Sequence, residues 1–432
     1  MLDNLKKLGG FIVQNKFKVI INSNLIDCVK KGLRKDIAVI LKGNKIDKIV
    51  PKTEVDLSSD KYEIIDAEGR YLMPGLIDTH VHVFHPGFVP KAPAGDKTAY
   101  AGVVALKNLK TTLQSGVTTV RDVSSGYVNV ALKTAINRNL FKGPRLYAAG
   151  RGICMTGGHG TEMEDPYGSN VIQADGEVEI RKAIRKEINS GADLIKILTS
   201  HTQEYPEYTQ EELNIAVEEA HRFGKRVACH AGNAVTTRMA TIAGVDTIEH
   251  GIDIDEETAK MMEEKNITLV PTLWVLHDIK EKTEERQNKY KKINEYELHQ
   301  ESFESTLNRY EKIMARIPKT MEIINKYNIN IATGTDNIRW YRPFAMLHEE
   351  IYFLTQYGLS NMEAIIAATK GGAKAIGVED QIGTIEPGKY ADLIMVENNP
   401  LEDIKVLKDI NWVMKDGEII EQSSEWNRYK QR

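Results

Sequence analysis

The sequence has few of the residues that mark a secreted or membrane protein. Its 432 residues include three cysteines, an odd number spaced far apart at Cys28, Cys154 and Cys229. Such cysteines fit a reducing compartment better than a disulfide framework. The apolar patch at residues 11–13 is shorter than the core of a signal peptide, and no apolar run approaches the length of a membrane-spanning helix. We expect a cytoplasmic protein without a membrane partner.

An excess of positive charge is also missing. The formal net charge is −4, charged residues make up 27% of the chain and hydrophobic residues 41%, which is ordinary for a globular enzyme. Because there is no basic arm, nucleic acid and anionic membranes are not the expected partners. The length suffices for one large α/β barrel with a smaller domain, or for three average domains.

Strand-like and helix-like segments alternate through the middle of the chain. The strand-like segments lie at residues 75–83, 118–123, 145–149, 194–198, 226–231, 247–251, 268–273 and 330–335. Eight βα units of this size predict an α/β fold with a (β/α)8 TIM-type barrel. A doubly wound open sheet is the alternative, but no glycine-rich phosphate loop follows the first strand. Short β patterns before residue 67 and after residue 390 predict that both chain ends share a small sheet domain.

A stretch rich in Lys, Glu, Asn and Tyr interrupts this alternation at about residues 276–316. We expect one or two long exposed helices there, which form a lid or an oligomer contact. The alternative is a solvated charged helix without a role in catalysis.

Residues able to bind metal occupy the ends of several predicted strands. His80 and His82 alternate along the first strand, so their side chains point the same way from positions about 6–7 Å apart. The later strand ends add four further candidates, Lys196, His230, His250 and Asp336. Each alone could be a hydrogen-bonded filler or a helix cap. Together they predict a metal site at the edge of the barrel where strand ends meet.

The chemistry of these side chains suits a pair of divalent ions. Imidazoles and carboxylates bind borderline metals such as zinc, and two ions about 3.5–4 Å apart can share a hydroxide formed at neutral pH. Burial near cations lowers the pKa of a lysine, and the free amine of Lys196 can then add carbon dioxide to give a bridging carbamate. Unmodified, Lys196 would form an ion pair at the barrel mouth. Asp336 could bind metal through one oxygen and move a proton with the other.

In this strand order the candidate ligands resemble those of the amidohydrolase superfamily, in its binuclear form with a carboxylated lysine. The segments Met-Pro-Gly-Leu-Ile-Asp at 73–78 and Ile-Gly-Thr-Ile-Glu-Pro-Gly-Lys-Tyr-Ala-Asp-Leu at 382–393 carry the same resemblance. It implies that His80, His82 and Asp336 bind one metal ion, that His230 and His250 bind the other, and that carboxylated Lys196 bridges them. Zinc is the expected metal, with manganese, cobalt and iron as alternatives.

The same resemblance implies the domain organisation. A metal-dependent hydrolase barrel would span residues 74–375, with the charged helical insertion at about 276–316. A β-sandwich domain would combine residues 1–73 and 376–432.

The segment Thr-Gly-Gly-His-Gly at 156–160 resembles the branch that contains imidazolonepropionase-like enzymes and Xaa-Pro dipeptidases (prolidases). This resemblance implies that His159 polarises the scissile carbonyl and that Tyr208 contacts the substrate carboxylate. Alternatively, His159 stabilises its loop and Tyr208 is an ordinary aromatic residue at a helix entry. Arg339 lies just past Asp336 and could also bind a carboxylate. The segment at 200–205 departs from the glycine-rich loop common in this branch.

The function implied is hydrolysis of a C–N bond by a metal-bridged hydroxide, with a small-molecule substrate such as an Xaa-Pro dipeptide or an N-acyl amino acid. We also expect a homo-oligomer. The first alternative is an imidazolonepropionase-like hydrolase of cyclic amides, followed by a phosphoester or lactone hydrolase. A non-catalytic assembly protein on the same fold would lack several of the metal ligands.

Overall fold

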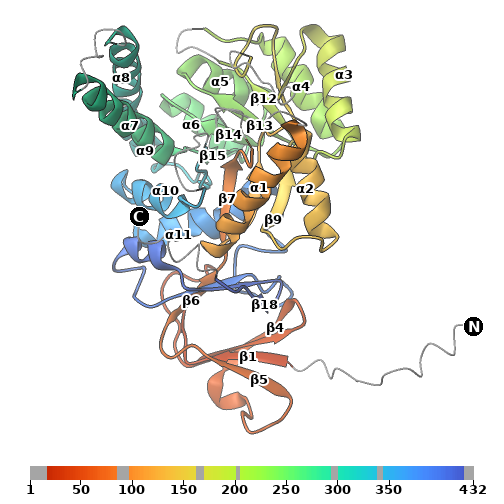
Figure 1. Cartoon of the computed structure of the whole chain (residues 1–432), viewed down its shortest axis with the longest axis vertical. Coiled ribbons are helices and arrows are strands. Elements are labelled where there is room, and N and C mark those ends of the chain that lie inside the picture. The colour runs from red at the N-terminus through yellow and green to blue at the C-terminus, as the bar shows by residue number, and fades with distance from the viewer. Residues whose placement is uncertain are drawn as a thin grey trace, which may run out of the picture.

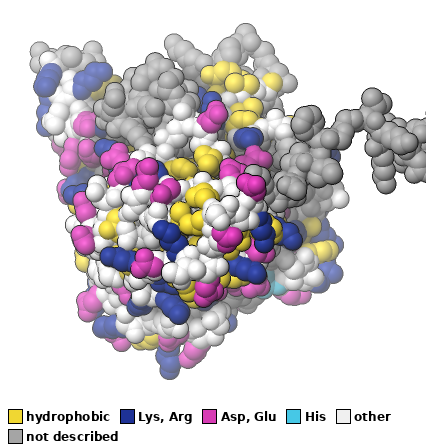
Figure 2. Space-filling model, turned by 90° about the horizontal axis from the view of Figure 1, so that it is seen from below, with side chains coloured by type: hydrophobic (Ala, Val, Ile, Leu, Met, Phe, Trp, Pro, Cys, Tyr) yellow, Lys and Arg dark blue, Asp and Glu magenta, His cyan; other side chains and the backbone are white. Residues whose placement is uncertain are grey.

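A computed structural model describes residues 17–84, 97–161, 170–200, 205–292, 300–337 and 344–422. Figure 1 shows two parts, a β-rich part at the bottom and a larger α/β part above it. Strands from both chain ends, coloured red and blue, lie together in the lower part. Seen from below, Lys and Arg side chains are interspersed with Asp and Glu side chains on this face (Figure 2). No described helix is both long enough and apolar enough to cross a membrane.

Two sheets make up the β-rich part. One has the order β4-β3-β1-β5 and the other β18-β17-β16-β6-β2. Their strands are β1 (Phe17–Ile21), β2 (Asn24–Leu25), β3 (Ile37–Lys42), β4 (Lys45–Pro51), β5 (Tyr62–Asp66), β6 (Tyr71–Pro74), β16 (Leu393–Val396), β17 (Trp412–Lys415) and β18 (Glu418–Ile419). Pairing of β16 with β6 joins the two chain ends, in antiparallel register from Leu393 opposite Pro74. A shared apolar core that includes Val39, Leu72 and Met395 holds the sheets together.

Parallel strands form the centre of the α/β part. One sheet has the order β7-β8-β9 and the other β11-β10-β12-β13-β14-β15. Their strands are β7 (Leu76–Val81), β8 (Val117–Asp122), β9 (Arg145–Ala148), β10 (Gly152–Cys154), β11 (Val171–Gln173), β12 (Leu194–Leu198), β13 (Arg226–Ala231), β14 (Thr247–His250) and β15 (Thr268–Val270). Seven of the eight predicted strands are present, and the sequence patterns did not predict β10 and β11.

The eighth predicted strand, residues 330–335, is not a regular strand. It makes one isolated bridge, between Ile331 and Leu269 of β15. Further on, Thr79 of β7 donates its N–H to the carbonyl oxygen of Thr333 at 2.8 Å, so the segment lies between the two sheets. A Cβ atom at Gly334 would stand 2.5 Å from the Cβ atom of His80, so glycine permits this close approach. The backbone of Asp336 then turns left-handed, with φ of 44°.

Helices follow the strands and cover them from outside (Figure 1). They are α1 (Lys97–Gln114), α2 (Tyr127–Asn137), α3 (Gly176–Asn189), α4 (Gln210–Arg222), α5 (Ala234–Ala243), α6 (Glu256–Glu264), α7 (Leu273–Lys292), α8 (Gln300–Met314), α9 (Ile317–Ile324), α10 (Leu347–Gln356), α11 (Asn361–Ile366) and α12 (Gly372–Ile376). Thr209 and Glu212 form a capping box that begins α4, which satisfies backbone donors at its first turn.

The charged stretch after β15 forms two helices that pack on each other. The α7 helix begins at Leu273, so the predicted strand at 268–273 is shorter than expected. Lys280 of α7 pairs with Glu311 of α8 at 3.6 Å, and the rings of Tyr290 and Phe303 lie 5.5 Å apart. Figure 1 draws this pair in dark green beside α9. We call α7 and α8 together the helical pair.

Candidate metal centre

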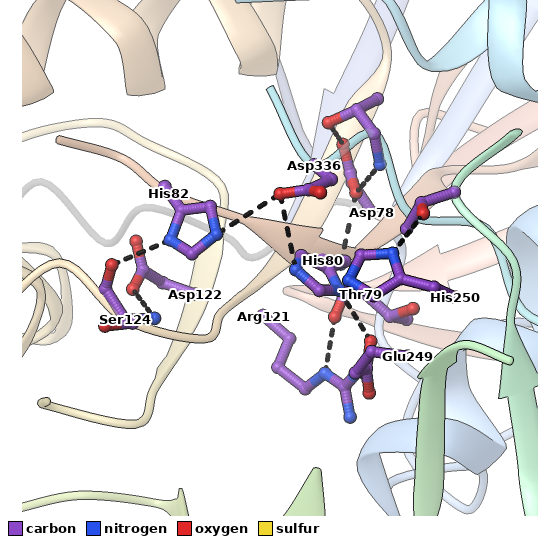
Figure 3. Close-up of polar contacts among 12 residues, drawn as sticks. Asp78, Thr79, His80, His82, Arg121, Asp122, Ser124, Glu249, His250 and Asp336 are labelled. Atoms are coloured by element: carbon purple, nitrogen blue, oxygen red, sulfur yellow. Dashed lines mark hydrogen bonds and ion pairs between the residues drawn. The ribbon is translucent and has the colours of Figure 1, made fainter. Parts of the chain in front are cut away.

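Two histidines and one aspartate converge at the end of β7. His80 lies within the strand and His82 one residue past its end, while Asp336 comes from the irregular segment beside it. Oδ1 of Asp336 lies 3.5 Å from Nε2 of His80 and 3.3 Å from Nε2 of His82 (Figure 3). One candidate ligand atom from each residue lies within 4.8 Å of the others. This set can hold one divalent metal ion.

A buried network fixes the orientation of His80. Its Nδ1 lies 2.7 Å from Oε2 of Glu249 on β14, and the other oxygen of Glu249 lies 2.6 Å from Nη2 of Arg121 on β8 (Figure 3). Thr247 donates its hydroxyl to the same oxygen at 2.5 Å. A carboxylate can only accept, so the proton of the neutral imidazole resides on Nδ1. Nε2 is therefore the nitrogen whose lone pair could bind a metal ion.

A backbone carbonyl fixes the orientation and the tautomer of His82 in the same way. Nδ1 of His82 donates to the carbonyl oxygen of Ser124 at 2.7 Å. The loop that carries Ser124 is held by Asp122, which accepts the N–H of Ser124 at 3.1 Å and the N–H of Val83 at 2.6 Å. Both histidines therefore present Nε2 toward Asp336.

The other predicted histidines lie in the same place. His230 lies in β13 and His250 is the last residue of β14. The ring centroids are 5.2 Å apart for His80 and His250, 4.6 Å for His230 and His250, and 4.4 Å for His159 and His230. Nδ1 of His250 lies 2.6 Å from the hydroxyl of Thr272. The structure thus brings the histidines predicted from separate strand ends into one cluster.

Lys196 of β12 is buried in the same strands, with 1% of its surface exposed. Its Nζ atom has no hydrogen-bond partner among the described residues. A buried ammonium group without a hydrogen-bond partner would be costly. Burial accordingly lowers the pKa of Lys196 below its ordinary value. The alternative role for an unmodified Lys196 was an ion pair at the barrel mouth. Lys196 forms no such ion pair with any described residue.

Burial and neighbouring charges set the protonation of the ligands. Burial lowers the pKa of His80 to about 4 and that of His250 to about 3, so both are neutral at physiological pH. Burial also acts to lower the pKa of His82. The Asp336 carboxylate outweighs burial there and raises the pKa of His82. Burial opposes ionisation of Asp336, yet the neighbouring histidines hold its pKa well below the ordinary value. Neutral imidazoles beside a carboxylate are the forms that bind metal.

A cavity of about 140 Å³ opens beside this cluster. His159, His230, His250 and Asp336 line one side of it, and residues of the helical pair line another. His159 is held through its backbone, whose N–H donates to the carboxylate of Glu207 at 3.0 Å. Its ring lies beside that of His230, and the residue lines the cavity.

One of the predicted substrate-binding residues, Tyr208, is not among the described residues that line this cavity. Tyr208 is 3% exposed and donates its hydroxyl to the carbonyl oxygen of Ala174 at 2.9 Å, so it is placed as a core residue. Contact with a substrate would require its hydroxyl to leave this bond. Arg339 lies outside the described residues.

Arg121 and Glu249 are parts of the site that the sequence patterns did not single out. Both lie in buried strands, and a charged residue within a buried strand needs a buried partner. The charge of Arg121 and of Glu249 within their strands was therefore a signal that could have identified both residues from the sequence. Asp78 is a third such residue, and it accepts the N–H and the hydroxyl of Thr335 at 3.0 and 2.7 Å, which ties β7 to the segment that carries Asp336.

Comparison with known proteins places this site in a family. The chain matches the amidohydrolase family over residues 71–420. Ochratoxinase from Aspergillus niger is 29% identical over 381 residues, which are 81% of this chain and 75% of that protein. Imidazolonepropionase from Sphingopyxis alaskensis is 24% identical over 401 residues, which are 84% of this chain and 86% of that protein.

Solved structures agree with the sequence relatives. A Xaa-Pro dipeptidase with methionine bound in its active site is 32% identical, covers 94% of this chain and 100% of its own, and has a TM-score of 0.81. A. niger ochratoxinase is 26% identical, with 94% and 95% covered and a TM-score of 0.77. The chain therefore belongs to the amidohydrolase family and is a hydrolase that acts on carbon–nitrogen bonds.

Proposed function

We propose that this protein is a metal-dependent amidohydrolase that cleaves the amide bond of a dipeptide or an N-acyl amino acid. The observation that carries the proposal is the convergence of His80, His82 and Asp336, with Nδ1 of each histidine already occupied by a fixed partner. Donors arranged in this way are suited to hold a cation.

The donor set fits two divalent ions. His80, His82 and Asp336 would hold one, and His230 and His250 the other. When bound, the metal ions supply a water molecule of lowered pKa and polarise the substrate carbonyl. Zinc suits imidazole and carboxylate ligands, and manganese, cobalt or iron are alternatives.

We propose that Lys196 bridges the two ions as a carbamate. The support is the buried, unpartnered Nζ atom and the lowered pKa of its amine. A neutral amine attacks carbon dioxide through its lone pair, forms an N–C bond and releases one proton. The carboxylate that results would offer two oxygens as metal ligands.

Asp336 is proposed to move the proton. Its carboxylate lies at the cavity wall and is ionised, so it can accept a proton from water and deliver it to the leaving amine. His159, on the same wall, is proposed to donate a hydrogen bond to the oxyanion that develops on the carbonyl oxygen.

The substrate class rests on the relatives. One solved relative is a Xaa-Pro dipeptidase with methionine bound, and another is a prolidase in complex with N-methylphosphonate-L-proline. Both ligands are amino acids or their derivatives, which favours a substrate with an amino acid as one half. The imidazolonepropionase relative covers 84% of this chain and makes a cyclic amide the second candidate.

We further propose that the parallel strands close into one (β/α)8 barrel over residues 74–375. Two sets of hydrogen bonds support this closure. Residues 330–336 bond to both β15 and β7, and Asp193, just before β12, donates its N–H to the carbonyl oxygen of Ala148 in β9 at 2.8 Å. The remaining segments, 1–73 and 376–432, would form the β-sandwich domain.

Three buried cysteines without disulfides suit the reducing cytoplasm.

A substrate panel tests the proposed function. The metal-loaded protein is mixed with Xaa-Pro dipeptides, N-acyl amino acids and imidazolonepropionate, and the release of free amine or the loss of ring absorbance is followed. Release of amine from the first two classes is expected. Loss of ring absorbance alone would favour the second candidate, and no turnover of any compound would contradict the proposal.

A further inference from the structure

The helical pair lines the same cavity as the histidines. Its lining residues are Val275, Leu276 and Ile279 from α7, and Arg309, Tyr310 and Ile313 from α8. The metal-binding side chains and the wall that these residues form therefore face the same space. A substrate whose amide lies at the histidines has to place the rest of its atoms against α7 and α8.

The wall is apolar in its depth and charged at its edge. Leu276, Ile279 and Ile313 are 7%, 4% and 3% exposed, so they present packed aliphatic surface. Arg309 is exposed and lies four residues before Ile313 on α8, which places both side chains on one face of the helix. Among the described lining residues, Arg309 is the one with a permanent positive charge.

Resting on the proposed function, we propose that the helical pair selects substrates with one apolar group and one carboxylate. Arg309 binds the carboxylate at the mouth, while Leu276, Ile279 and Ile313 contact the apolar side chain. N-acyl amino acids with aliphatic or aromatic side chains have this pattern.

The size and charge of the cavity agree with this class. Its volume of about 140 Å³ resembles that of an apolar cavity of about 150 Å³ that takes up benzene. One branched or aromatic side chain fits such a space. The guanidinium of Arg309 can donate two parallel hydrogen bonds to a carboxylate, which fixes the orientation of the molecule as well as holding it.

Binding of two matched compounds tests the proposal without turnover. N-acetyl-leucine and N-acetyl-leucinol differ only in that a neutral alcohol replaces the carboxylate. Each is titrated by calorimetry into metal-loaded protein that carries Asp336→Asn, which suppresses hydrolysis. The carboxylate compound is expected to bind about tenfold more tightly, the size of a modest charge-assisted hydrogen bond.

Variants on α8 assign that preference. Arg309→Gln should reduce the tenfold preference to near unity, whereas Arg309→Lys should retain part of it. Lys312→Gln is the matched control, because Lys312 is an exposed cation on the same helix that does not line the cavity. Ile313→Ala should weaken both compounds about fivefold and leave their ratio unchanged, since it removes only apolar contact.

Each contrary result overturns the proposal. The first is equal affinity for the two compounds when Arg309 is unchanged. The second is an equal loss of affinity for both compounds in Arg309→Gln. The third is loss of the preference for the carboxylate compound in Arg339→Gln instead of Arg309→Gln. Failure of the proposed function looks different. In that case the protein with Asp336 intact releases no acetate from N-acetyl-leucine, yet Arg309 still governs the binding preference.

Discussion

Glu249 is the buried carboxylate on which the orientation of His80 depends, and we expect Glu249→Gln to weaken both metal binding and the fold. The carboxylate has no exposed surface and contacts His80 at 2.7 Å and Arg121 at 2.6 Å. Glutamine keeps the size of the side chain, but its one oxygen can accept from only one of these two donors. If its NH2 group faces His80, the imidazole must accept there and carry its proton on Nε2, the metal-binding nitrogen.

The magnitude follows from the two partners. Arg121 is 2% exposed and would lose its carboxylate, and breaking a buried ion pair in this way costs about 3–5 kcal/mol. Loss of the partner that orients a metal-binding histidine typically costs about 10- to 100-fold in metal affinity. The assays are a zinc titration against a competing chelator and urea unfolding of the metal-free protein.

Glu257→Gln is the matched control. Glu257 pairs with Arg238 through two contacts of 2.6 and 2.8 Å, but the side chains of Arg238 and Glu257 are 39% and 67% exposed. Exposed ion pairs contribute little to stability. We expect this variant to match the wild type in both assays. If Glu249→Gln also bound zinc and unfolded like the wild type, the proposed role of Glu249 would be refuted.

Three further predictions concern single side chains. Asp336→Asn should remove most turnover while metal content stays largely unchanged, and wild-type activity would refute its role as proton carrier. Lys196→Ala should lose metal and activity together, with partial recovery in short carboxylic acids; an unmodified amine at Lys196 in a crystal of active, metal-loaded protein would contradict the carbamate. Burial raises the pKa of Glu350 from 4.5 to about 8, so the folded chain holds a proton that the unfolded chain releases in this range. Stability should therefore fall as pH rises from about 4.5 to 8, and Glu350→Gln should lessen that fall in thermal unfolding measured across this range.

The clustering of the candidate metal ligands could be predicted because it follows from one geometric rule. Parallel strands place their carboxyl ends at one edge, so a histidine or carboxylate at each strand end must face the others. His80, His230 and Asp336 are therefore found together although the chain between them is long. The strand-like sequence patterns themselves predicted seven of the strands.

The remaining parts depend on contacts that no local pattern encodes. The partnership of Arg121 with Glu249 joins residues 128 positions apart, and only the closely packed interior decides that they meet. The segment at 330–335 has a strand-like composition, yet Gly334 and the left-handed Asp336 make it irregular. Tyr208 stands at the entry of a helix as predicted, but its ring packs into the core.

Metal content and hydrolysis measured on one preparation test the central claim most directly. The purified protein is loaded with zinc, freed of unbound ions, analysed for metal by mass spectrometry and then mixed with an N-acyl amino acid. We expect about two ions per chain, as in two-metal hydrolases, and release of the free amino acid that disappears when the metal is chelated. Less than about one ion per chain, with no hydrolysis restored by zinc, manganese or cobalt, would contradict a binuclear amidohydrolase.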